Sequence, residues 1–142
     1  MQTSPSSTSL PLTPTSRLWT VGLVAGLLAT LLNVGLALIL GPALKVSSSF
    51  ALFQPITILV ACVVGSLVAT LAYVLLRRFV TQPDSTFIAL AVFALLASFA
   101  LPWSIGDSTS PRFAGVTLEI QLVLSAMHAI TAVCVVFLLL RK

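Results

Sequence analysis

His128 is the only histidine of the 142-residue chain and falls near the middle of a charge-free apolar stretch close to the C-terminus. Imidazole exchanges a proton near neutral pH, and a polar group in hydrocarbon needs a partner or costs several kcal/mol. His128 shares one face of a helix with Gln121, Ser125 and Ala132, because steps of 4, 7 and 11 residues from Gln121 return within about 40°. This face predicts one of two roles for His128. It is a proton-accepting or ligand-contacting group at the end of a narrow cavity, or a structural residue that hydrogen-bonds Asn33 or a backbone carbonyl.

Asn33 is the side chain that we expect to pair with His128, because it lies on the small-residue face of another apolar stretch. Polar pairs of this kind ordinarily hold membrane helices together, so we interpret both residues first as scaffold and second as transport residues. Glu119 lies about 180° from His128 on the same helix, so the two form no dyad. We interpret Glu119 as a first-turn carboxylate stabilised by the helix dipole and water. The alternatives are pairing with Arg112 or an ion-facing role at an outer mouth.

The other reactive side chains form no recognisable site. Cys62 and Cys134 are expected to differ by about 15 Å in depth, too far for a disulfide, and are interpreted as packing residues. Tyr73 is interpreted as an interfacial belt aromatic rather than a catalytic phenol. The chain has one histidine and no HExxH, GxSxG or P-loop motif. We therefore expect no enzyme activity, no catalytic residue, no cofactor and no metal site.

The composition places these residues in a membrane. The chain is 58% hydrophobic and 7% charged, with a mean hydropathy of +1.17, whereas soluble globular proteins carry roughly 25% charged residues. The apolar excess must face lipid, so the bilayer is the first expected partner. The net charge of +4 comes from basic residues scattered at helix ends, without a basic stripe or an aromatic platform. This distribution indicates contact with anionic head groups and argues against nucleic-acid binding.

Four charge-poor stretches are long enough to cross a bilayer as helices. We expect spans at about 18–40, 55–77, 86–105 and 117–140, within an all-α transmembrane domain covering residues 17–142. The preceding residues 1–16 are Ser, Thr or Pro at 12 of 16 positions. Such a segment buries too little apolar surface to offset its ordering entropy, and we expect a disordered cytoplasmic tail.

Local signals mark the ends of the spans. Gly41 and Pro42 are expected to end the first span, and Pro55 to begin the second as a first-turn proline. Asp84 and Ser85 are the capping candidates of the third span. Near the other end of that span, the ring of Pro102 is expected to disturb the helix.

The basic residues predict the orientation of this polytopic four-helix bundle. With four spans both termini share one side of the membrane. That side carries five basic residues (Arg17, Arg77, Arg78, Arg141 and Lys142), and the other side carries two (Lys45 and Arg112). By the positive-inside rule, we expect both termini to be cytoplasmic.

Small residues predict where the helices touch, because helices in lipid associate through close packing and hydrogen bonds. One stripe runs along the first span: Gly22, Gly26, Ala29, Asn33 and Ala37. Another runs along the second span, Ala61, Gly65 and Ala69, with Ser66 and Thr70 beside it. We expect both to lie in seams of the bundle; alternatively, one stripe faces a second copy of the chain.

Three short segments resemble a family of small bacterial four-helix integral membrane proteins known only as a domain of unknown function. They are Arg17-Leu18-Trp19 followed by the small-residue run from Gly22 to Asn33, Pro55 at the second span, and Ala126-Met127-His128-Ala129 in the last span. The resemblance covers residues 17–140. It implies the four-span fold and the bacterial plasma membrane, and it implies no activity. Small multidrug transporters also have four short helices, but they share a membrane-embedded glutamate in the first span, where this chain has only Asn33.

Two hypotheses for function follow. The first is a non-enzymatic structural or partner-binding membrane module, whose partner would be a second copy or another membrane protein, with His128 and Asn33 as scaffold. The second is a small oligomeric transporter or permeation pathway that uses His128 and Gln121 near the middle of the membrane.

Overall fold

The computed structural model describes residues 15–46, 50–105 and 116–141. These residues form α1 (Thr15–Ala43), the short 3-10 helix η1 (Ala51–Phe53), α2 (Pro55–Phe79), α3 (Pro83–Ser98), α4 (Ala100–Ile105) and α5 (Leu118–Leu140). No strand occurs in this part of the chain, which confirms the predicted all-α class. Most of the predicted tail lies outside the described residues, and α1 already includes Thr15 and Ser16.

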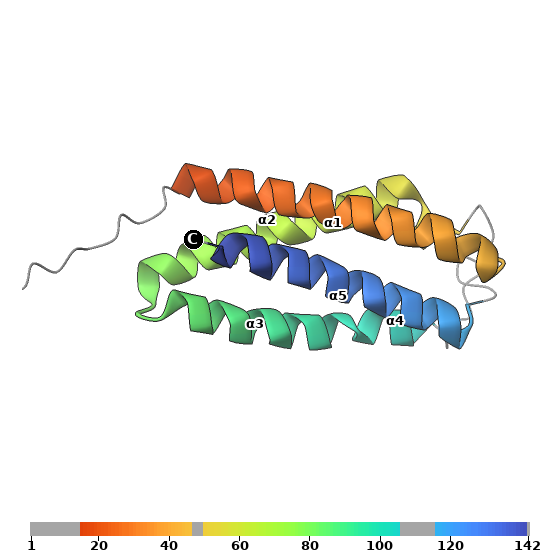
Figure 1. Ribbon diagram of the computed structural model, residues 1–142. Coiled ribbons are helices and arrows are strands. Elements are labelled where there is room, and N and C mark those ends of the chain that lie inside the picture. The colour runs from red at the N-terminus through yellow and green to blue at the C-terminus, as the bar shows by residue number, and fades with distance from the viewer. Residues whose placement is uncertain (1–14, 47–49, 106–115, 142) are drawn as a thin grey trace, which may run out of the picture.

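Four helical stretches are long and apolar enough to cross a bilayer: Thr15–Ala43, Pro55–Phe79, Pro83–Ile105 and Leu118–Leu140. They lie alongside one another as a bundle, with the start of α1 and the end of α5 near the same end (Figure 1). Large apolar side chains cover the outside, such as Ile39 at 72% exposed and Phe93 at 70%. A surface of this kind is stable against lipid, so the four-span prediction is confirmed and the protein is built as a multi-pass membrane protein.

The sequence predicted that the first span ends at Gly41 and Pro42, but both residues lie inside the last turn of α1. Lys45 adopts the left-handed conformation with φ of 53°. The Val46 N–H donates to the Gly41 carbonyl at 2.9 Å and the Lys45 N–H donates to the Pro42 carbonyl at 3.1 Å. These are the two bonds of a Schellman motif, which satisfies the last carbonyls of the helix. A proline in the last turn costs α1 only one backbone bond, so the helix continues past it.

The starts of the second and fourth spans agree with prediction. Pro55 is the first residue of α2, where its missing N–H has no partner to lose, and Gln54 precedes it at the N-cap position. In the same way α5 begins at Leu118 after Thr117. α2 therefore starts at the proline that the sequence indicated, and α5 starts within one residue of the expected bound of about 117.

The third span starts earlier than predicted and is broken. α3 begins at Pro83, and no side chain makes a capping hydrogen bond at its N-cap residue, so the predicted capping by Asp84 and Ser85 is wrong. At the far end the helix is interrupted at Phe99, three residues before Pro102, and resumes as α4. Pro102 has no N–H to donate to the Ser98 carbonyl one turn earlier, which accounts for the break.

The Asp84 side chain has a different role, which also corrects the interpretation of Tyr73. The Tyr73 hydroxyl donates to Asp84 Oδ1 at 2.7 Å, and its ring lies 4.9 Å from the ring of Phe87 between centroids. Tyr73 is only 5% exposed, so it is not a lipid-facing belt aromatic. It joins the end of α2 to the start of α3, because the short turn between them brings these two helix ends together.

The seam between α1 and α2 is built from glycines that face small hydroxyl side chains. A Cβ atom on Gly22 would overlap Thr70 Oγ1, and one on Gly26 would overlap Ser66 Oγ. Both hydroxyls are buried and bond their own helix: Thr70 Oγ1 donates to the Ser66 carbonyl at 2.8 Å and Ser66 Oγ to the Val63 carbonyl at 2.9 Å. With no polar atom left unpaired, the helices approach closely, which confirms the predicted seam role of the first stripe.

The second small-residue stripe lies in a seam only at Ala69, which is partly buried against the cluster containing Tyr73 and Phe87. Ala61 and Gly65 are exposed, and no described atom lies within 4 Å of a Cβ built on Gly65. The buried face of α2 is the neighbouring one, formed by Ile58, Cys62, Ser66, Thr70 and Tyr73. The prediction placed the wrong face of α2 in the seam. Serine and threonine are small enough to pack against the glycines of α1 as alanine would, so the neighbouring face is the buried one.

We expect Gly26→Leu to destabilise the bundle by about 1–3 kcal/mol, because the added atoms meet the Val63 Cα at 3.0 Å and cannot be accommodated by a flexible side chain. Gly35→Leu is the matched control: it lies on the same helix, and no described atom is within 4 Å of the added Cβ. Unfolding followed by circular dichroism in detergent measures both. Equal losses in the two variants would contradict the seam.

Candidate functional site

Asn33 is the centre of a polar cluster inside the bundle and is 1% exposed. Its Nδ2 lies 3.0 Å from Thr131 Oγ1 and 3.2 Å from the Met127 carbonyl oxygen, both on α5, and 3.4 Å from Cys62 Sγ on α2. The Thr131 hydroxyl itself donates to the Met127 carbonyl at 2.9 Å, so it is free to accept from Asn33. We call these four residues the Asn33 cluster. It ties α1, α2 and α5 together at one level.

The orientation of the Asn33 amide follows from its neighbours. A carbonyl oxygen only accepts, so the NH₂ group and not the oxygen must face Met127. The Oδ1 atom is buried and has no hydrogen-bond partner among the described residues. An unsatisfied buried acceptor costs about 1–3 kcal/mol. The cluster therefore holds one enclosed acceptor without a donor among the described residues.

His128 does not make the predicted bond with Asn33, which donates instead to Thr131 and to the backbone of Met127. The imidazole is half-buried, and no hydrogen bond to it occurs in the part of the chain that the structure describes. Thr131 lies about 60° around α5 from His128, on the side turned to α1. The structural role predicted for His128 therefore belongs to Thr131, and His128 is left with its hydrogen-bonding atoms unused.

A cavity of about 620 Å³ lies between α3 and α4 on one side and α1, α2 and α5 on the other. Its lining is mostly aliphatic and includes the second small-residue stripe, Ala61, Gly65 and Ala69. The polar residues among its described lining are Asn33, Thr57, Cys62, Ser98, His128 and Thr131, and none of that lining is Asp, Glu, Lys or Arg. The cavity exists because α3 is fixed to α2 mainly near the connecting turn, by Tyr73, Asp84 and Phe87. We call this space the central cavity.

Only part of the predicted polar face of α5 reaches the central cavity. His128 and Ala132 line it, whereas Gln121 and Ser125 do not belong to its described lining. Gln121 is 9% exposed and packs nearer the start of α5, and the Ser125 hydroxyl donates to the Gln121 carbonyl at 2.9 Å within the helix. The face therefore does not form one continuous polar surface.

Glu119 is exposed in the first turn of α5, and its carboxylate accepts a hydrogen bond from Thr117. This environment agrees with a first-turn carboxylate stabilised by the helix N-terminus. The alternative partner Arg112 lies outside the described residues.

Sequence reasoning missed Thr131 and assigned Cys62 only to packing. The Asn33 cluster puts Cys62 level with Thr131, so Cys134 lies about one turn from that level, and the expected 15 Å difference is wrong. The reason is an axial offset: the end of α5 stops short of the end of α2 (Figure 1). Both cysteines are free. The available signal was that Thr131 shares the buried stripe of α5 with Leu124 and Val135, where a polar side chain requires a partner.

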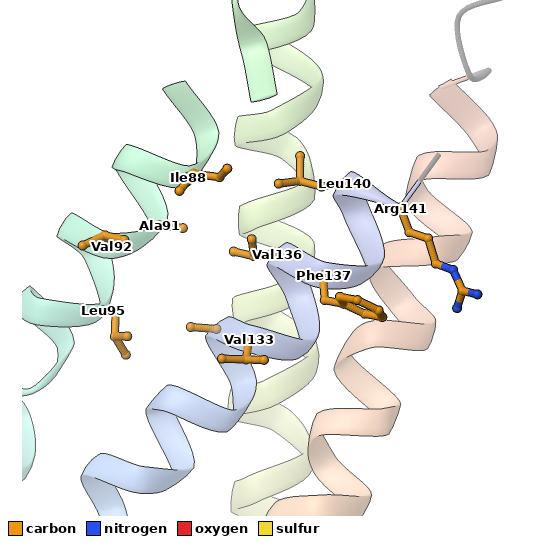
Figure 2. A pocket seen from close by; sticks show the side chains of 10 residues that line it. Ile88, Ala91, Val92, Leu95, Val133, Val136, Phe137, Leu140 and Arg141 are labelled. Carbon is orange, nitrogen blue, oxygen red and sulfur yellow. The ribbon is translucent and has the colours of Figure 1, made fainter. Parts of the chain in front are cut away.

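A second hollow lies between α3 and α5 and has a volume of about 510 Å³. Figure 2 shows Ile88, Val92 and Leu95 of α3 beside Val133 and Val136 of α5. Apart from Arg141, whose guanidinium lies 5.9 Å from the centre of the Phe137 ring, its described lining is apolar. Arg141 at the end of α5 is the one polar residue of this described lining, whereas the central cavity brings together polar side chains from four helices and is the candidate site.

Comparison with known proteins gives one match: the model of a family described as "Family of unknown function (DUF6069)" fits residues 13–142. No curated protein and no solved structure matches the chain. The match covers almost the whole chain, including all four spans, and it assigns no activity.

The geometry predicts that Asn33→Ala destabilises the protein more than His128→Gln, because Asn33 links helices through hydrogen bonds and His128, among the described residues, does not. A double-mutant cycle of Asn33→Ala with Thr131→Val should give a coupling energy of about 0.6–2 kcal/mol, the range for such bonds in membranes. Thr30→Val is the control, since the Thr30 hydroxyl donates only to the Gly26 carbonyl of its own helix, at 2.8 Å. Titration with a denaturing detergent measures these free energies. A larger loss for His128→Gln than for Asn33→Ala would reverse our assignment.

Proposed function

Since the chain belongs to DUF6069, a family of unknown function, we propose from its geometry that it is a non-enzymatic membrane module that binds a lipid-soluble partner inside the bilayer. The observation that carries this proposal is the central cavity beside a frame of three closely joined helices. Its volume of about 620 Å³ falls within the roughly 300–1,000 Å³ of small-molecule sites, which are likewise mostly apolar with a few polar groups.

The division between frame and cavity favours binding over a purely structural role. The frame of α1, α2 and α5 is joined by the glycine seam and by the Asn33 cluster. α3 carries small residues on its cavity side, such as Ala91, Ala94 and Ser98, yet these stand across an open volume from Gly65 of α2. Walls separated in this way lose dispersion contacts unless an occupant restores them.

The chemistry of the cavity supports a non-catalytic role. General acid–base or nucleophilic catalysis needs two reactive groups within hydrogen-bond reach of each other or of a substrate. Within the described lining His128 is the only imidazole, and both Cys62 and Thr131 are engaged with Asn33. Of the other polar residues in the described lining, the Ser98 hydroxyl donates to the Leu95 carbonyl at 2.7 Å, and Thr57 lies in the first turn of α2, about five residues from the level of Cys62.

The arrangement gives less support to transport. A permeation pathway needs polar groups spread along the direction of travel. Here Asn33, Cys62 and Thr131 are bonded to one another, Ser98 and Ser125 are bonded within their own helices, and Gln121 lies apart from the described lining. A lipophilic molecule that enters sideways from the membrane fits this lining better than an ion or a polar solute.

We also propose a bacterial plasma membrane setting with both termini cytoplasmic. Arg17, Arg77, Arg78 and Arg141 all belong to helix ends at one end of the bundle, and Lys45 lies at the other (Figure 1). Such an asymmetry supports the positive-inside orientation. Cysteine labelling of each terminus from either side of sealed vesicles tests it.

Filling the cavity should remove its occupant. In Gly65→Leu the new side chain enters open space, so we expect the helix frame to stay intact and at least a tenfold drop in bound lipid-soluble molecule. Native mass spectrometry of the protein released from membrane nanodiscs measures the occupancy. Gly35→Leu, which also meets open space but lies outside the described lining, should keep the wild-type occupancy. A wild-type protein without an occupant, or equal occupancy in both variants, would count against the proposal.

A further inference from the structure

We infer that the ligand of the central cavity is an uncharged long-chain alcohol, with its hydroxyl at His128 and its chain between α2 and α3. This inference rests on the proposed binding function and specifies the chemical class of the partner. It is drawn from the depth, the charge, the unsatisfied polar atoms and the size of the cavity.

The depth of His128 excludes a surface head group. α5 runs from Leu118 to Leu140, so His128 lies about 15 Å from either end of the helix at about 1.5 Å per residue. A ligand that reaches it has its polar group near the middle of the hydrocarbon, far from the phosphate layer. A phospholipid held by its own head group does not fit this position.

The lining then excludes a charged ligand. None of the described residues around the cavity is Asp, Glu, Lys or Arg, so a carboxylate, phosphate or ammonium group would lose its hydration without gaining an ion pair. The polar group of the ligand is therefore neutral.

The unused hydrogen-bonding atoms select a hydroxyl among neutral groups. A neutral imidazole has one donor and one acceptor nitrogen, and neither is used within the described part of the chain. The Asn33 Oδ1 is fully buried behind this lining, so the imidazole is the group that a ligand reaches. A hydroxyl donates and accepts, whereas a ketone or ester only accepts and an alkane does neither. The imidazole thus favours an alcohol.

The size of the cavity suits a single hydrocarbon chain. Its volume of about 620 Å³ lies within the range of sites that hold one small molecule. A single hydrocarbon chain fits, and the strongly exposed Val68 of α2 and Leu101 of α4 border a route from the membrane. Gly65, with open space at its Cβ position, lets the chain lie directly against the α2 backbone.

The test uses a diazirine-bearing hexadecanol as the photoprobe, with the full-length protein in phosphatidylcholine nanodiscs. Mass spectrometry locates the labelled peptide and measures its yield while unlabelled hexadecanol, hexadecane or palmitate competes at pH 8. We expect labelling within residues 55–105, with hexadecanol at least tenfold more effective as competitor than the other two. This competition in the wild-type protein needs no variant.

Two variants separate the parts of the inference. His128→Leu should reduce the preference for the alcohol over the alkane to within twofold, and His128→Gln, which keeps a donor and an acceptor, should retain most of it. Equal competition by hexadecane in the wild-type protein, or an unchanged preference in His128→Leu, would overturn the alcohol while leaving the binding function in place. Equal labelling of wild-type, Gly65→Leu and Gly35→Leu proteins would instead overturn the binding function itself.

Discussion

Helices surrounded by lipid gain little from burying apolar side chains, because the lipid tails are equally apolar. The frame of this protein therefore depends on a few contacts between helices in which atoms pack closely or form hydrogen bonds. Gly22 and Gly26 allow Thr70 and Ser66 to come against the backbone of α1, and seven residues beyond Gly26 the Asn33 amide reaches α5. Both contacts are made by α1, which explains why α1 is the central member of the frame, packed extensively on both α2 and α5.

The same constraint explains why α3 is the loosest of the four spans. It brings no glycine to a neighbouring helix, and it is tied to α2 by the hydrogen bond that Tyr73 donates to Asp84 near its start. Beyond that point the break at Phe99 redirects the chain so that α4 packs on α5. A helix fixed at one end and bent near the other encloses space along its middle. The central cavity thus lies beside the middle of α3, where this helix has no glycine and no cross-helix hydrogen bond among the described residues to draw it against its neighbours.

The sequence predicted the elements of this fold better than their mutual rotation. The number of spans and the starts at Pro55 and Leu118 depend on local composition and on proline, so they could be derived without knowledge of the partners. The contact face of α2 could not, because alanine and serine are both small, and the choice between the Gly65 face and the Ser66 face depends on the opposing helix. The axial offset of α5 was equally hidden, and with it the choice of Thr131 over His128 as partner of Asn33. Rotating a helix by one residue about its axis, or moving it along its axis by one turn, leaves the hydropathy of the sequence unchanged but exchanges the contacts that the helix makes.

The position of His128 is informative because an apolar residue there would have a lower free-energy cost in hydrocarbon. Asn33 is satisfied by a threonine and a backbone carbonyl on the same helix, so a leucine at position 128 would have left the frame intact and spared the cost of a polar ring in hydrocarbon. The imidazole is half-buried beside an aliphatic cavity, and it makes no hydrogen bond with the described residues. Its unfavourable burial is not offset by the frame, since the frame does not use it. The remaining candidate for that offset is the cavity itself: a hydroxyl-bearing occupant would satisfy the ring and restore the dispersion contacts that the separated walls lack. One binding event would then compensate the two least favourable features of the bundle, which is why we connect the central cavity and the His128 imidazole to a single function.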